Sequence, residues 1–150
     1  MSEQAAGAQG NEVCGILIGY FRDDGTVEVT EASDAGPGAK STPTGCWRDV
    51  DYVQKWIDEK LRRGDEKLRY VGEWHSHPSL DTRPSHVDVE SLMGVASSPN
   101  YLCPTPVMVV LGLSTQGEEK LSAYSFAVEK PYKEIVWELV NETGEIRQEQ

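Results

Sequence analysis

Short apolar runs separated by turn-forming residues dominate the pattern along the chain, and they predict a fold rich in strands. The first run, residues 13–21, is rich in Ile, Leu and Val, which is typical of a buried strand. The Asp24-Gly25 pair then predicts a hairpin turn into a second strand over residues 27–32. Further predicted strands cover residues 68–77, 106–113 and 121–128. The pattern of residues 132–140 fits either a helix or an edge strand.

Two other segments have apolar residues at helical spacing, and each begins at a capping residue. The first follows Asp49 and stops at Gly64, and the second follows Ser85 and stops at residues 97–100. Their apolar faces consist of Val50, Val53, Ile57 and Leu61, and of Val89, Leu92, Met93 and Ala96. The Pro- and Gly-containing residues 33–45 read as a loop. Strands mixed with two helices, without an internal repeat, predict one layered α/β or α+β domain.

Composition agrees with a single folded domain and excludes some classes of binding partner. The chain has 150 residues, of which 38% are hydrophobic and 26% charged. Its 14 Lys and Arg against 25 Asp and Glu give a net charge of −11, which argues against a nucleic acid or an anionic membrane as partner. No apolar run is long enough to span a bilayer, and the first residues do not resemble a secretory signal. Residues 1–11 are small and polar, and we expect a flexible or weakly helical N-terminus there.

The three cysteines, Cys14, Cys46 and Cys103, form neither a CxxC pair nor an even set. The simplest expectation is therefore that they are reduced and that the protein is cytoplasmic. Cys14 is expected as a small core residue. Neither Cys46 nor Cys103 has a nearby base signature, so a thiol nucleophile is not expected.

The stretch that carries chemistry is His75-Ser76-His77-Pro78, followed after six residues by Ser85 and Asp88. Residues two apart on a strand point the same way, so His75 and His77 offer two imidazoles to one point. Asp88 lies in the first turn of the following helix and can bring a carboxylate there. Two histidines and one carboxylate, with a fourth position left for water, are the ligands of a catalytic zinc ion.

A purely structural interpretation of the same residues exists. Ser85 and Asp88 have the spacing of a capping box, in which the two residues only close the end of a helix. His75 and His77 can be solvated strand residues. The metal interpretation is favoured because the chain has only three histidines and the ordered spacing joins all the ligands.

The full motif HSHP-x6-SxxD, with Glu12 opening an upstream apolar strand, resembles the JAMM (MPN+) metalloprotease family. The segment GEWHSHP at residues 72–78 is most similar to its prokaryotic JAB branch, as is the AGPGA loop at residues 35–39 followed by WRD at residues 47–49. The resemblance runs from Glu12 to about residue 113. It implies one MPN domain over residues 12–150, with a curved mixed β-sheet flanked by helices.

By position, the resemblance implies that His75, His77 and Asp88 hold Zn²⁺. It makes Glu12 the general base for the attacking water and Ser85 the group that stabilises the oxyanion. Glu73 is a second candidate for the general base because it shares a strand face with the histidines. The alternative interpretation of Glu73 is a solvated strand carboxylate without a catalytic role. Relatives usually have a longer helix before the glutamate strand than this chain allows.

The resemblance also implies a function: a zinc isopeptidase or peptidase that cuts after the C-terminus of a ubiquitin-like protein. It would release the modifier from targets or trim its precursor, in the setting of a bacterial anti-phage conjugation system with E1- and E2-like enzymes as partners. Two alternatives remain open, namely processing of sulfur carriers with a ubiquitin-like fold and a non-catalytic MPN scaffold.

Overall fold

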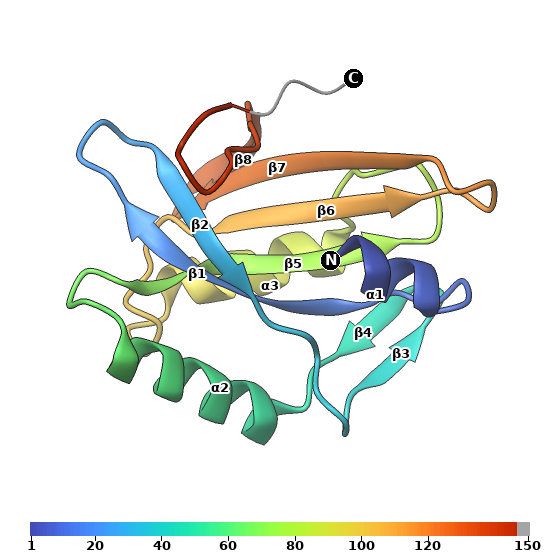
Figure 1. Cartoon of the computed structure of the whole chain (residues 1–150), viewed down its shortest axis with the longest axis horizontal. Coiled ribbons are helices and arrows are strands. Elements are labelled where there is room, and N and C mark those ends of the chain that lie inside the picture. The colour runs from blue at the N-terminus through green and yellow to red at the C-terminus, as the bar shows by residue number, and fades with distance from the viewer. Residues whose placement is uncertain (147–150) are drawn as a thin grey trace.

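A six-stranded mixed sheet forms the centre of the computed structural model, which describes residues 1–146 (Figure 1). The strand order is β2-β1-β5-β6-β7-β8, and only the central pair β5 and β6 is parallel. The strands are β1 (Cys14–Phe21), β2 (Val27–Ala32), β5 (Arg69–His77), β6 (Val107–Leu113), β7 (Glu119–Ala127) and β8 (Lys130–Ile135). A separate hairpin pairs β3 (Lys40–Thr42) with β4 (Gly45–Trp47).

Two helices, α2 (Val50–Arg63) and α3 (His86–Ser97), pack on one face of this sheet. Val53 of α2 and Val95 of α3 join one core cluster with Ile16 of β1 and Tyr70 of β5. Leu92 extends the core across β6 and β7. The opposite face is filled from the sheet itself by Leu17, Val71, Trp74 and Val107. The α/β class and the sheet flanked by helices are thus confirmed.

Both predicted helices begin at the predicted caps. The Asp49 carboxylate accepts a hydrogen bond from the Tyr52 amide at 3.2 Å, and Gly64 follows the last residue of α2. The basic last turn of α2 complements the negative end of the helix dipole. The predicted strands are also present, and β8 shows that residues 130–135 are an edge strand rather than a helix.

The prediction of a loop over residues 33–45 is wrong in its second half, where β3 and the first residue of β4 lie. Three-residue strands are too short to show an alternating pattern, and their turn at residues 43–44 contains a proline. Trp47, at the end of this hairpin, is 59% exposed.

The expectation of three reduced cysteines is also wrong. Cys14 and Cys46 form a disulfide across a sequence separation of 32, and Cys103 is a buried free thiol. The bond ties β1 to the hairpin formed by β3 and β4. In the chain-entropy model, closing a loop of this length stabilises the fold by on the order of 3–4 kcal/mol. Cys14 does lie in the core, as expected.

The N-terminal segment contains a short helix, α1 (Ser2–Gly7), whose Ala5 is buried. The helix lies near the ends of β5 and β6 (Figure 1). The domain boundary at residue 12 stays a prediction. Among residues 1–146, no helix has both the length and the apolar character that a membrane crossing requires.

Candidate metal centre

The carboxyl end of β5 fixes the two histidines. β5 is bonded to β1 on one side and to β6 on the other, so it is a central strand. Trp74 anchors it on the opposite face, where the ring is 1% exposed and donates from Nε1 to the Ser33 carbonyl at 2.9 Å. His75 and His77 follow with their rings tilted toward each other, 4.8 Å apart between centroids.

The start of α3 fixes the carboxylate. The Ser85 hydroxyl accepts from the Asp88 amide at 3.1 Å, and Asp88 Oδ2 accepts from the Ser85 amide at 2.7 Å. The capping box is therefore present. It coexists with the cluster, because the same Oδ2 lies 3.1 Å from His75 Nε2. The structural and chemical interpretations of this motif are not exclusive.

The ligand atoms of His75, His77 and Asp88 converge on one point. The two Nε2 atoms are 3.0 Å apart, and His77 Nε2 lies 3.8 Å from Asp88 Oδ2. Ligand atoms around a tetrahedral zinc ion are about 3.3–3.5 Å apart, given bonds of about 2.0–2.1 Å. The observed separations of 3.0 to 3.8 Å bracket this value. The three residues therefore fit a metal ion of this kind.

The neighbourhood of His77 selects the tautomer that such a site needs. Its Nδ1 lies 2.6 Å from the Asp81 carbonyl oxygen, which can only accept, so Nδ1 carries the proton. Nε2 is then left with a free lone pair that faces Asp88. A backbone carbonyl of this type is a usual partner of metal-binding histidines. The sequence did not identify Asp81, because main-chain acceptors leave no residue signature.

Glu12 lies beside this cluster at the entrance to β1. Its Oε1 is 3.9 Å from His77 Nε2, and the residue is only 8% exposed. Burial raises the pKa of the Glu12 carboxyl above its ordinary value, and the nearby His75 and His77 offset part of this rise. The structure thus brings Glu12 to the side of the three candidate ligands, as the sequence predicted.

Ser76 holds the Glu12 segment against β5. Its hydroxyl accepts from the Val13 amide at 2.9 Å, and its own amide donates to the Val13 carbonyl at 2.8 Å. This residue, between the two histidines in sequence, was not predicted to have a role. Its position on the face opposite the histidines gives it access to the β1 main chain.

The charges of the cluster reinforce one another. Burial alone would raise the pKa of the Asp88 carboxyl, but the adjacent His75 and His77 rings favour its charged form, outweigh burial and hold that pKa well below its ordinary range. The Asp88 carboxylate in turn raises the pKa of His77, against partial burial, which lowers it. Asp88 is therefore an anion at all ordinary pH values, as a metal ligand must be.

Glu73 is neither a solvated carboxylate, as its alternative interpretation held, nor directed to the cluster. It is buried, and its Oε1 accepts from Arg48 at 3.0 Å and from the Tyr70 hydroxyl at 3.2 Å. These bonds occupy its carboxylate under the start of α2. His86, by contrast, is exposed and pairs with Glu90 on the outside of α3.

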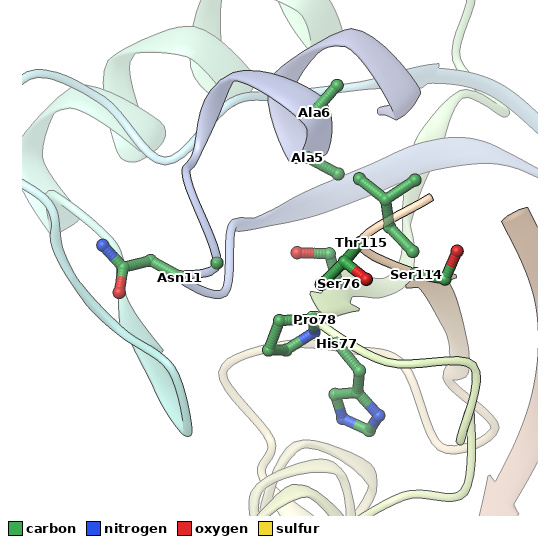
Figure 2. Close-up of a pocket in the computed structure, with 10 residues that line it drawn as sticks. Ala5, Ala6, Asn11, Ser76, His77, Pro78, Ser114 and Thr115 are labelled. Atoms are coloured by element: carbon green, nitrogen blue, oxygen red, sulfur yellow. The ribbon is translucent and has the colours of Figure 1, made fainter. Parts of the chain in front are cut away.

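A pocket of about 200 Å³ lies beside His77, between α1 and the ends of β5 and β6. Figure 2 shows Ala5 and Ala6 on one side of it, Ser114 and Thr115 on another, and the His77 ring directed away from α1. Its lining mixes small apolar residues with polar ones. The pocket and the histidine cluster thus occupy adjacent positions at one edge of the sheet.

Two histidines at a strand end, a carboxylate at the next helix start and a buried glutamate thus lie side by side, as the resemblance to the JAMM (MPN+) family implies. Comparison with family models agrees. The model described as prokaryotic homologs of the JAB domain matches residues 1–126, so this chain belongs to that family.

Two curated relatives are more specific. The chain is 36% identical over 114 residues to a protein named CD-NTase/cGAS isopeptidase from Enterobacter hormaechei, covering 75% of this chain and 62% of the relative. It is 32% identical over 101 residues to a probable metalloprotease of Sinorhizobium fredii, covering 67% and 62%. The chain thus spans about three fifths of the length of these relatives.

Solved structures support the fold. A protein of Desulfitobacterium hafniense aligns with a TM-score of 0.62 at 22% identity, covering 90% of this chain and 84% of its own. A protein of Salinibacter ruber aligns with a TM-score of 0.58 at 22% identity, covering 99% and 89%. These likenesses extend through most of the sheet and helices.

Proposed function

We propose that this protein is a zinc-dependent isopeptidase or peptidase that cuts after the C-terminus of a ubiquitin-like protein. The single observation that carries the proposal is the convergence of His75, His77 and Asp88 on one point, with Glu12 at 3.9 Å from His77. The relative named CD-NTase/cGAS isopeptidase supports the peptide-bond chemistry and a protein substrate. The relative named a probable metalloprotease supports the metal.

Zinc is the metal that this donor set favours. Two imidazole nitrogens and one carboxylate oxygen are typical of catalytic zinc sites that keep an open position. When bound, zinc lowers the pKa of a coordinated water toward about 7 and polarises the scissile carbonyl. His75, His77 and Asp88 would hold the ion, while the Asp81 carbonyl keeps the His77 ring in the required tautomer.

Glu12 acts as the general base. Its carboxylate accepts a proton from the attacking water and passes it to the leaving amine, so that charge never accumulates on the nitrogen. Because burial raises the pKa of Glu12, the protonated form that must donate to the amine is more stable than in an exposed glutamate. The closed lining around this side chain also keeps bulk water from competing for the proton.

Ser85 donates a hydrogen bond to the oxyanion. Its oxygen accepts from the Asp88 amide, which uses a lone pair and leaves the hydroxyl proton free. One side chain can therefore cap α3 and stabilise the transition state at the same time. This removes the conflict between the structural and catalytic interpretations of Ser85.

Replacing Ser85 with alanine should slow cleavage by about 10²-fold or more, because it deletes the oxyanion donor. Zinc content should stay at one ion per chain, and loss of the cap should cost about 1 kcal/mol of stability. Ser85→Thr, which keeps a hydroxyl, is the matched control and should recover much of the rate. Steady-state kinetics with metal analysis decide this. An Ser85→Ala variant as fast as the native protein would exclude Ser85 as the donor.

A flexible tail suits this site better than a folded segment. The ubiquitin-like substrate that the family resemblance implies ends in a flexible tail of small residues, which can reach a metal centre at the end of a strand. Within residues 1–146, β4 pairs only with β3, which leaves one short strand edge free. An extended peptide can add to such an edge through its main chain.

Cleavage is therefore expected directly after the last small residue of a ubiquitin-like tail, whether the next group is a lysine side chain or a short extension. Mass spectrometry of cognate modifier fusions after incubation with the protein identifies the bond. Enlarging the residue before the cut should reduce the rate sharply, and changes beyond the cut should matter less. Cuts scattered through unstructured peptides would instead indicate a general peptidase.

The proposal includes a setting. We place the protein in the bacterial cytoplasm, with E1- and E2-like conjugation enzymes as partners and defence against phage as the process. The Enterobacter relative is named CD-NTase/cGAS isopeptidase, which supports the isopeptidase part of this setting. The net charge of −11 favours a substrate or partner with a basic surface.

A further inference from the structure

The Cys14–Cys46 disulfide lies beside the proposed catalytic base, and no step of the mechanism uses it. We propose that this bond positions Glu12, so that the rate of hydrolysis depends on the oxidation state of the cysteine pair. The inference rests on the proposed function, in which Glu12 is the base. It adds two positioning residues that no sequence motif contains.

The bond connects the two parts of the chain that fix Glu12. Cys14 comes two residues after Glu12 and is the cross-strand partner of the candidate ligand His75. Cys46 is the cross-strand partner of Ser41 in the hairpin of β3 and β4. The Cα atoms of the two cysteines are 6.0 Å apart. The covalent link therefore runs from the β1 strand next to the metal centre directly to the hairpin.

The same hairpin holds the Glu12 main chain. The Glu12 amide donates to the Thr42 carbonyl at 2.8 Å, and the Ser41 hydroxyl donates to the Glu12 carbonyl. The hydrogen bonds that the described residues give to Glu12 all involve its main chain, and its carboxylate lies 3.9 Å from the nearest imidazole nitrogen, His77 Nε2. The backbone of residue 12 therefore positions the carboxylate. The disulfide adds a covalent link to the hydrogen bonds that hold this backbone against the hairpin.

Reduction would remove this covalent link between β1 and the hairpin. A cellular dithiol attacks one sulfur; the Cys14–Cys46 bond breaks, both cysteines become thiols, and the reductant becomes a disulfide after giving up two electrons and two protons. Cys46 is half-buried on an exposed hairpin, so its sulfur is the accessible one, whereas Cys14 is buried. A displacement of about 1 Å in a catalytic group can cost about 10²-fold in rate.

The proposed cytoplasmic setting is consistent with a redox-sensing role for the disulfide. Disulfides in cytoplasmic proteins of mesophiles are usually catalytic or redox-sensing rather than permanent. Oxidation of the cell would then favour the cross-linked, active form, and reducing conditions would favour a slower form. Cys103, buried and distant in sequence from both partners, takes no part in the exchange.

The test compares oxidised protein, protein reduced with a phosphine, and the Cys46→Ser variant. Thiol titration after denaturation should count one free thiol in the oxidised protein and three after reduction. Reduction should lower kcat about 10-fold or more while one zinc per chain remains bound. Cys46→Ser should match the reduced protein and should not respond to the phosphine.

The Glu12→Gln variant distinguishes a disulfide that positions Glu12 from one that only stabilises the fold. If the disulfide acts through Glu12, reduction should leave the residual rate of Glu12→Gln unchanged, because the positioned group is already gone. An equal fold-loss in that background would assign the bond a general structural role and overturn the proposal. So would an unchanged kcat in native protein with three free thiols.

Hydrogen exchange tests the same proposal without any activity. Reduction should speed exchange of the Glu12 amide, which donates to Thr42, and leave the Val110 amide in the centre of β6 unchanged. If the oxidised protein cleaves no modifier fusion, the proposed function fails, but this arm still decides the positioning role. Unchanged exchange at Glu12 after complete reduction would contradict it, and faster exchange confined to the Glu12 segment would support it.

Discussion

Replacing Glu12 with glutamine is expected to remove turnover almost completely while zinc stays bound. Glutamine has nearly the same shape, but its amide cannot take a proton from water or return one to the leaving amine. A positioned general base contributes about 10²- to 10⁴-fold, so kcat should fall by that factor. The fold should be unaffected, because the hydrogen bonds that hold residue 12 come from its main chain.

Glu73→Gln is the matched control for this experiment. Glu73 is also a buried glutamate on β5, but Arg48 and Tyr70 occupy its carboxylate. The substitution should weaken the ion pair with Arg48 and cost about 1–3 kcal/mol of stability, with kcat nearly unchanged. Steady-state kinetics on both variants, with circular dichroism for the fold, separate the two residues. A fully active Glu12→Gln beside an inactive Glu73→Gln would mean that the base has been assigned to the wrong residue.

Replacing His77 with alanine is expected to release the metal and, with it, all measurable hydrolysis. The remaining His75 and Asp88 cannot enclose a tetrahedral ion. The loss of affinity should exceed the roughly 10- to 100-fold that follows removal of a ligand's hydrogen-bond partner. Metal analysis after gel filtration should find far less than one zinc per chain.

His86→Ala provides the comparison for His77→Ala. His86 is nine residues further along the chain and belongs to the same motif region, but its side chain is exposed and pairs only with Glu90 among the contacts described. The variant should keep its zinc and its rate. Full zinc occupancy in His77→Ala would contradict the proposed metal centre, whatever the behaviour of His86→Ala.

The sequence predicted those features that short-range patterns encode. The spacing of His75 and His77 follows from strand periodicity, and the Ser85 cap fixes where α3 starts and hence where Asp88 points. The long strands and both main helices have enough residues to show a period. For this reason the sequence predicts the metal cluster and the elements that carry it.

Features that depend on distant parts of the chain could not be predicted. The partner of Cys14 is 32 residues away, and an odd cysteine count argued against any bridge. The hairpin of β3 and β4 is recognisable only through its contacts with Glu12 and Cys14. The burial of Glu73 depends on Arg48, which approaches only when α2 folds against the sheet.

The sequence also could not predict how closely β1 approaches Ser33 and Trp74. A Cβ on Gly15 would lie 2.1 Å from the Ser33 carbonyl oxygen and 2.5 Å from Trp74 Nε1, so only glycine allows this contact. The sequence shows the glycine but not what approaches it. The contact anchors Trp74, and Trp74 in turn supports the strand that carries both histidines.

The most direct measurement compares metal-stripped and zinc-reloaded protein on one linear fusion of a cognate ubiquitin-like modifier. Dialysis against a chelator should abolish cleavage, and about one equivalent of zinc should restore it with the same cut site after the modifier's tail. The same reloading should fail in His77→Ala. Cleavage that continues at full rate in protein shown by metal analysis to hold no zinc would contradict the central claim that His75, His77 and Asp88 form a catalytic metal centre.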